Sequence, residues 1–141
     1  MSTYYTNEAA FDLPDIGFKD RTVTLLEAAT PLGAEMALML QRFPLPVGKS
    51  LREVVQSHLA GATRKLRGWT VLFERDIEIS SAPAIELAAS WRGEGGMVYT
   101  RQAHLAVGNT WLVVAGNAPL AEREAGDRVF EHVVSTLSVR E

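Results

Sequence analysis

The chain has 141 residues, of which 47% are hydrophobic and 22% charged, with a net charge of −3 and no cysteine. This length suffices for one domain with its own core and is short for two, so we expect a single domain over residues 1–141. Because Lys and Arg are scattered and the net charge is negative, the composition argues against nucleic-acid and anionic-lipid partners. The lack of cysteine excludes disulfides, thiol catalysis and zinc–thiolate sites.

The first residues, MSTYYTNEAAFDLPD, contain no basic region followed by an apolar run, which is the pattern of a secretory signal peptide. No apolar stretch of the sequence reaches the roughly 18–20 residues that a membrane-spanning helix needs. We therefore expect a protein that stays in the cytoplasm and does not itself insert into a membrane.

Short apolar and β-branched runs separated by turn residues predict strands along most of the chain. The predicted strands cover residues 9–13, 21–28, 34–42, 69–79, 84–92, 97–107 and 110–118. The last of these are joined through Gly93-Glu94-Gly95-Gly96 and Gly108-Asn109. Connections this short make neighbouring strands antiparallel, because a parallel connection needs a crossover of about a dozen residues.

The stretch FPLPVGKSLREVV at residues 43–55 contains Gly48-Lys49-Ser50, which resembles the end of a phosphate-binding P-loop. The full motif has a glycine where Phe43 stands, and Pro44 and Pro46 lack the backbone N–H groups that would hold a phosphate. We therefore interpret Gly48-Lys49-Ser50 as a loop that leads into a helix.

Two segments have the apolar periodicity of amphipathic helices. In the first, Ser50 and Glu53 form a capping-box pattern, and apolar residues continue along one face to Leu66. The second helix lies within residues 119–138, and Gly126 leaves its first residue undetermined. Its apolar stripe consists of Val129, Phe130, Val133, Val134 and Leu137.

Together these elements predict an α+β domain in which the helices pack on a mostly antiparallel sheet of about six or seven strands. A sheet covered on one face alternates apolar and polar residues, yet residues 36–40 and 111–115 are apolar throughout. Two helices do not cover both faces of so wide a sheet. We therefore expect a second subunit or a ligand to cover the remaining apolar surface.

The polar residues form no pattern typical of catalysis or metal binding. None of the three histidines, His58, His104 and His132, has a partner at the spacing that places two imidazoles on one helix face. We interpret each as a surface or hydrogen-bonded histidine. The glycines at 93–96 lack the strand-to-helix setting of a dinucleotide site, and no serine lies in a nucleophile-elbow pattern. We expect no enzymatic activity, no metal and no cofactor.

Two residues stand out within predicted strands. Gln102 lies among apolar neighbours and is either a solvent-facing strand residue or an amide in a binding surface. Met39 belongs either to the core or to a surface that accepts varied apolar partners through its flexible thioether. The residues alone leave both alternatives open.

Several segments, in order along almost the whole chain, resemble the Eag (effector-associated gene) chaperones of bacterial type VI secretion, within the DcrB-related family. The similar segments are Tyr5 to Pro14 (YTNEAAFDLP), Asp20 to Leu25 (DRTVTL), Glu35 to Arg42, Ser50 to Leu66, Gly68-Trp69, Trp91 with Glu94-Gly95-Gly96, and Arg101-Gln102.

The resemblance implies a PsbP-like α/β/α sandwich that pairs into a homodimer, in which the sheets form a hydrophobic cradle. Chaperones of this kind hold the N-terminal transmembrane segments of a secreted effector, commonly a Rhs or related toxin, in the cytoplasm before export. They also help to seat that effector on the VgrG spike. An effector with such segments is therefore the expected partner, and VgrG an indirect one.

The resemblance also implies client-binding positions, which in this sequence are Val23, Leu25, Met39, His58, Leu66 and Gln102. Most are apolar groove residues, Leu66 borders the groove, and Gln102 supplies an amide. His58 stands where the family commonly has a glutamine on the first helix. It keeps the capacity to form hydrogen bonds and could gain charge below about pH 6.5.

A second hypothesis is a PsbP-like, non-enzymatic assembly or regulatory subunit that binds a soluble protein. Retention of a partner without any apolar helix would favour it. An enzyme acting on a small molecule is a third hypothesis, and it would require a closed pocket with perturbed ionisable groups.

Overall fold

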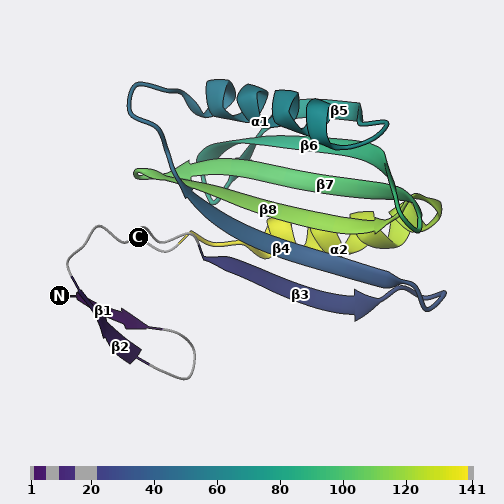
Figure 1. Cartoon of the computed structure of the whole chain (residues 1–141), viewed down its shortest axis with the longest axis horizontal. Helices are drawn as coiled ribbons and strands as arrows, with labels where there is room; N and C mark the ends of the chain where they lie inside the picture. The colour runs from purple at the N-terminus through teal and green to yellow at the C-terminus, as the bar shows by residue number, and fades with distance from the viewer. Residues whose placement is uncertain (1, 6–9, 15–21, 140–141) are drawn as a thin grey trace.

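The computed structural model describes residues 2–5, 10–14 and 22–139. Its largest element is a six-stranded antiparallel sheet with the strand order β3-β4-β8-β7-β6-β5 (Figure 1). The strands are β3 (Val23–Ala29), β4 (Glu35–Pro44), β5 (Thr70–Ile79), β6 (Ala82–Gly93), β7 (Gly96–Val107) and β8 (Thr110–Pro119). The predicted strands and the antiparallel hairpins at 93–96 and 108–109 are confirmed.

A helix packs on each face of this sheet. Helix α1 (Leu51–Lys65) lies over one face, and α2 (Arg123–Thr136), which follows a short 3₁₀ turn η1 (Leu120–Glu122), lies against the other (Figure 1). The result is the expected three-layer α/β/α arrangement. The two sides of the sheet are named the α1 face and the α2 face, after the helix that packs on each.

The predicted strand at 9–13 forms outside the main sheet. It is β2 (Ala10–Leu13), which pairs with β1 (Ser2–Tyr5) in a separate two-stranded sheet. Strand β1 was not predicted from the sequence, because STYY is only four residues long and does not alternate apolar and polar residues.

Local sequence signals fix both ends of α1. The Glu53 backbone N–H donates to Ser50 Oγ at 3.2 Å, and the Glu53 carboxylate accepts from the Ser50 N–H, which completes the predicted capping box. The helix ends at Lys65 with Leu66 as its C-cap, and Gly68 follows with a positive φ of 68°. The apolar side of α1 packs on β6 through Val55 and Leu59, which contact Ile85, Leu87 and Ala89.

On the opposite side, α2 buries Phe130 against apolar residues of several strands. The other buried members of this cluster are Ile79, Ala84, Ala103, Leu105 and Val114. The helix begins at Arg123, before Gly126, and a Cβ on Gly126 would approach the Ala118 Cβ to 3.1 Å. Glycine therefore permits close contact between α2 and β8.

The two helices leave part of the sheet uncovered. Every residue of β3 is exposed, including the apolar side chains of Val23, Leu25 and Leu26. The apolar stretch of β8 is different, because Val113, Val114 and Ala115 are buried within the fold. The surplus of apolar surface expected from the sequence therefore lies mainly on β3 and on the neighbouring β4.

Candidate binding groove

A groove of about 600 Å³ lies between α1 and the part of the sheet formed by β4, β8 and β7. Its lining is largely apolar and aromatic and includes Met39, Leu66, Trp69, Trp91, Trp111, Val113 and Ala115. Arg64 and Lys65 at the end of α1 are its charged lining residues, and no carboxylate lines it among the described residues. The groove therefore combines an apolar wall with one basic end.

Four of the six predicted client-binding residues line this groove. Met39 comes from β4, His58 from α1, Leu66 from the end of that helix and Gln102 from β7. Residues so far apart in the sequence meet because α1 packs over β6 and β7, next to β8 and β4 in the sheet. The structure thus brings together the positions that the resemblance implied separately.

The other two predicted residues, Val23 and Leu25, lie beside the groove on β3. Directly paired residues of antiparallel strands point to the same face, and Val23 pairs with Gln41 while Leu25 pairs with Met39. Both side chains are 53% exposed. They therefore extend the apolar surface of the groove onto the edge strand.

A chain of hydrogen bonds runs along the floor of the groove. Trp111 Nε1 donates to His104 Nδ1 at 3.1 Å, and His104 Nε2 lies 2.9 Å from Gln102 Oε1. Burial lowers the pKa of His104 to about 3, so its ring is neutral at neutral pH. Since an indole N–H can only donate, Nδ1 accepts and the single ring hydrogen is on Nε2. His104 therefore donates to the carbonyl oxygen of Gln102.

This directionality leaves the amide NH₂ of Gln102 as the group that can still donate. The Gln102 side chain is only 9% exposed, so it is not the solvent-facing residue that the sequence allowed. His58 lines the same groove as Gln102, and its ring lies 5.4 Å from that of His104. Burial lowers the pKa of His58, and nearby Lys65 adds to the decrease. The neutral form of His58 is therefore favoured.

His104 and Trp111 belong to the site, although the sequence pattern did not predict them there. His104 is fully buried, and it is hydrogen-bonded as one of the interpretations allowed. The available signal was the spacing, because His104 lies two residues from Gln102 and so points to the same face of β7. Trp111 gave no such signal, since it stands in an apolar run.

The DcrB family model matches residues 8–136. The chain belongs to the DcrB family. No curated protein sequence matches this DcrB-family chain.

Solved structures show the same fold. PA94 from Pseudomonas aeruginosa, described as a protein of unknown function and a candidate regulator, matches with a TM-score of 0.84 and 22% identity over 100% of this chain and 98% of PA94. LpqN of Mycobacterium tuberculosis, described as involved in cell envelope biogenesis, matches with a TM-score of 0.60 and 10% identity over 87% of both chains. Cyanobacterial PsbP (CyanoP) from Synechocystis sp. PCC 6803 matches with a TM-score of 0.55 and 7% identity over 89% of this chain and 95% of CyanoP. The fold of this DcrB-family chain is therefore PsbP-like, as the resemblance implied.

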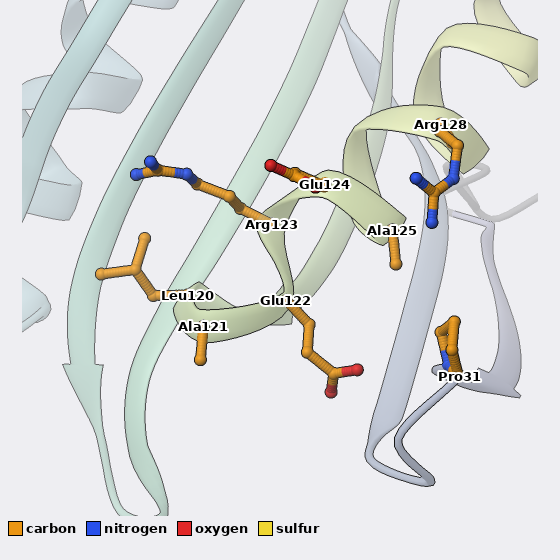
Figure 2. A pocket seen from close by; sticks show the side chains of 8 residues that line it. All are labelled: Pro31, Leu120, Ala121, Glu122, Arg123, Glu124, Ala125 and Arg128. Atoms are coloured by element: carbon orange, nitrogen blue, oxygen red, sulfur yellow. The ribbon is translucent and has the colours of Figure 1, made fainter.

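A second hollow of this DcrB-family chain lies where α2 begins (Figure 2). Its charged side chains point in different directions, as Figure 2 shows for Glu122, Arg123 and Arg128. Glu122 is occupied with the β3–β4 turn, because it accepts from Thr30 Oγ1 at 2.7 Å and from the Leu32 N–H at 3.3 Å. We interpret this hollow as part of the contact that holds the β3–β4 turn against the start of α2, and not as a binding site.

Neither a metal cluster nor a membrane-spanning helix occurs in the described part of this DcrB-family chain. Within residues 2–5, 10–14 and 22–139, no three His, Asp or Glu side chains gather as metal ligands. No helix there is long and apolar enough to cross a bilayer. The groove offers apolar contact and directed hydrogen bonds, which suit the binding of an apolar segment.

Proposed function

We propose that this DcrB-family chain is a cytoplasmic chaperone-adaptor of the Eag type. It binds the N-terminal transmembrane helices of a type VI secretion effector, of the Rhs or a related class, and keeps them from aggregating in water. It then promotes loading of that effector on the VgrG spike. The observation that carries the proposal is the groove, in which Met39, His58, Leu66 and Gln102 converge beside the exposed apolar strand β3.

The size of the groove supports a shared site. A transmembrane helix of about 20 residues is about 30 Å long and 10 Å across, which corresponds to roughly 2,400 Å³. The groove of one chain, at about 600 Å³, encloses a fraction of that volume. The exposed face of β3 and a second protomer would supply the remaining surface, and we therefore include a homodimer in the proposal.

The energetics allow binding that is strong and still reversible. Burial of about 800 Å² of apolar surface contributes on the order of 20 kcal/mol before association and ordering costs, which offset most of it. Amide groups in the groove would pair with the polar groups that transmembrane helices use to pack against one another. Gln102 is suited to this because its carbonyl oxygen accepts from His104 and its NH₂ group is a donor.

The test is co-expression of the full chain with an effector fragment that carries its apolar N-terminal helices. Val23→Asp and Met39→Gln place polar groups on the proposed binding surface, so we expect the fragment to be lost from the soluble complex. Affinity capture followed by quantification of the soluble fragment measures this.

Matched controls come from apolar residues away from the groove. Val47→Asp changes a fully exposed residue before α1, and Met97→Gln changes a residue of β7. Met97 pairs with Arg92 beside the pair Trp91–Val98 and so points to the α2 face. We expect both controls to retain the fragment. Undiminished capture by Val23→Asp and Met39→Gln would rule out the groove as the binding site.

The edge position of β3 favours a second candidate function. An exposed edge strand with apolar side chains on both faces can pair with a strand of another protein. We propose as the alternative a non-enzymatic assembly or regulatory subunit that binds a soluble protein. Stable retention of a partner that has no apolar helix, unaffected by Met39→Gln, would support this alternative over the chaperone.

A further inference from the structure

We propose that the groove contains a second polar subsite, formed by Trp69, Thr100 and Asn117, that binds a hydroxyl or amide side chain on the client helix about one turn away from the side chain that contacts Gln102. The inference rests on the proposed function, because it requires a helical client in the groove. We call these three residues the Thr100 subsite.

Three buried polar atoms in the groove carry the proposal. Trp69 Nε1, Thr100 Oγ1 and Asn117 Oδ1 are shielded from solvent and have no hydrogen-bond partner among the described residues. All three residues line the groove. Thr100 is only 1% exposed and pairs directly with Asn117 across β7 and β8, so both side chains point to the same face.

Buried polar groups are rarely left without a partner in proteins, because an unmade hydrogen bond is costly. Here three of the unpaired atoms belong to residues that line the same groove. The remaining buried unpaired atom, Arg101 Nε, belongs to a charged cluster on the α2 face. The clustering on the α1 face therefore points to a polar group supplied by the occupant.

The chemistry of the three atoms selects the kind of group. Trp69 Nε1 can only donate, Asn117 Oδ1 can only accept, and the Thr100 hydroxyl can do both. A hydroxyl or an amide on the client donates and accepts at once, so it satisfies this set. A carboxylate cannot donate and an ammonium cannot accept, so each would leave part of the set unpaired.

The spacing of the two polar positions matches an α-helix. Thr100 and Gln102 are two residues apart on β7, which is about 6.7 Å along a strand. Residues four apart on an α-helix are separated by about 6 Å along its axis and lie on the same face. Because α1 lies along the strands (Figure 1), a helix beside α1 would run in this direction. We therefore infer that the client carries small polar residues at positions i and i+4.

The test uses host helices fused to the N-terminus of a soluble carrier protein. Each host has about 20 Leu and Ala residues. The first carries two serines four residues apart, the second has alanine at both positions, and the third carries the serines two residues apart, on different faces. We expect the full-length wild-type chain to bind the first host about tenfold more tightly than the other two, which corresponds to one or two additional hydrogen bonds.

Variants assign the preference to the subsite. Thr100→Val removes the hydroxyl group while it keeps the shape of the side chain. Trp69→Phe removes the indole N–H, which comes from a different part of the chain, directly before β5. We expect each to reduce the preference to about threefold while the alanine host binds as before. Thr100→Ser keeps a hydroxyl and should keep the preference. Trp91→Phe is the matched control, because Trp91 lines the same groove and its nitrogen is not a buried unpaired atom.

The outcomes separate this inference from the proposed function. Tight binding of all three hosts with equal affinity, or full preference in both Thr100→Val and Trp69→Phe, would overturn the subsite and leave the chaperone function standing. Failure of the wild type to bind any host would overturn the chaperone function and the subsite with it. If Thr100→Val does not fold, Trp69→Phe alone decides the assignment.

Discussion

At the scale of single residues, one donor-only group sets the hydrogen-bonding character of the groove. Because the indole N–H of Trp111 can only donate, His104 Nδ1 must accept. The neutral ring therefore carries its hydrogen on Nε2 and donates it to Gln102. Gln102 therefore faces the groove as a donor. This role of Gln102 depends on His104 remaining uncharged.

The stability of the protein should depend on pH through His104. The pKa of His104 is lowered from 6.5 to about 3 by burial, so between these values the unfolded chain binds a proton that the folded chain does not. This contribution to stability is therefore complete above about pH 6.5 and decreases as the pH falls toward 3. At about pH 5 the loss from this residue is about 2 kcal/mol relative to neutral pH.

Urea unfolding at about pH 7 and about pH 5 measures this loss. In His104→Leu the titrating group is absent, so the decrease in unfolding free energy between the two values should be smaller than in the wild type by that amount. His132→Leu changes an exposed histidine of α2 and should keep the wild-type decrease. Equal pH dependence in His104→Leu and wild type would contradict the assignment.

At the scale of elements, successive side chains of β7 point to opposite faces of the sheet, so neighbouring residues make different contacts. Gln102 points into the groove, whereas Arg101 points to the α2 face and is almost fully buried. There Arg101 pairs with Glu86 of β6 and with Asp127 of α2, whose carboxylate lies 2.7 Å from Arg101 Nη1. Tyr99 also donates to Asp127 at 2.7 Å. This cluster connects α2 to β6 and β7 and therefore helps to hold in place the strand that carries Gln102.

The N-terminus of α1 gives a prediction at the same scale. Ser50→Ala removes the capping oxygen that accepts from Glu53, and we expect the free energy of unfolding to fall by about 1 kcal/mol. Ser57→Ala makes the same change inside α1, where alanine is the better helix former, so stability should stay equal or rise by a few tenths of a kcal/mol. Chemical denaturation of both variants measures the difference. Equal effects would mean that the cap does not contribute.

At the scale of the whole molecule, the exposure of strand β3 and the limited volume of the groove support the proposal that two protomers form the binding surface together. We expect the full chain to sediment at twice the mass of one protomer, because a second copy would cover apolar surface that α1 and α2 leave exposed. Analytical ultracentrifugation over a range of concentrations measures this mass. A monomer at all concentrations, with or without a captured helix, would contradict the homodimer.

Most elements of this fold follow from local physical chemistry, and the sequence alone predicted the six strands of the main sheet, β2 and both helices, although not β1 or the first residue of α2. Ser50 and Glu53 begin α1 through bonds within one turn, and the glycine-containing turns at 93–96 and 108–109 close hairpins between strands adjacent in the chain. The apolar runs at residues 36–40 and 111–115 also predicted an uncovered apolar surface, but the run in β8 is buried and the uncovered surface lies mainly on β3 and β4.

Only the tertiary structure decided what the groove offers to a ligand. The bond from Trp111 to His104 depends on the pairing of β8 with β7, and the convergence of His58 with Gln102 depends on where α1 packs on the sheet. The burial that keeps His104 neutral and leaves Thr100 unpaired likewise arises from packing, which no local pattern encodes. Local interactions determine helices and hairpins, whereas hydrogen-bond partners and solvent exclusion exist only once the layers have assembled.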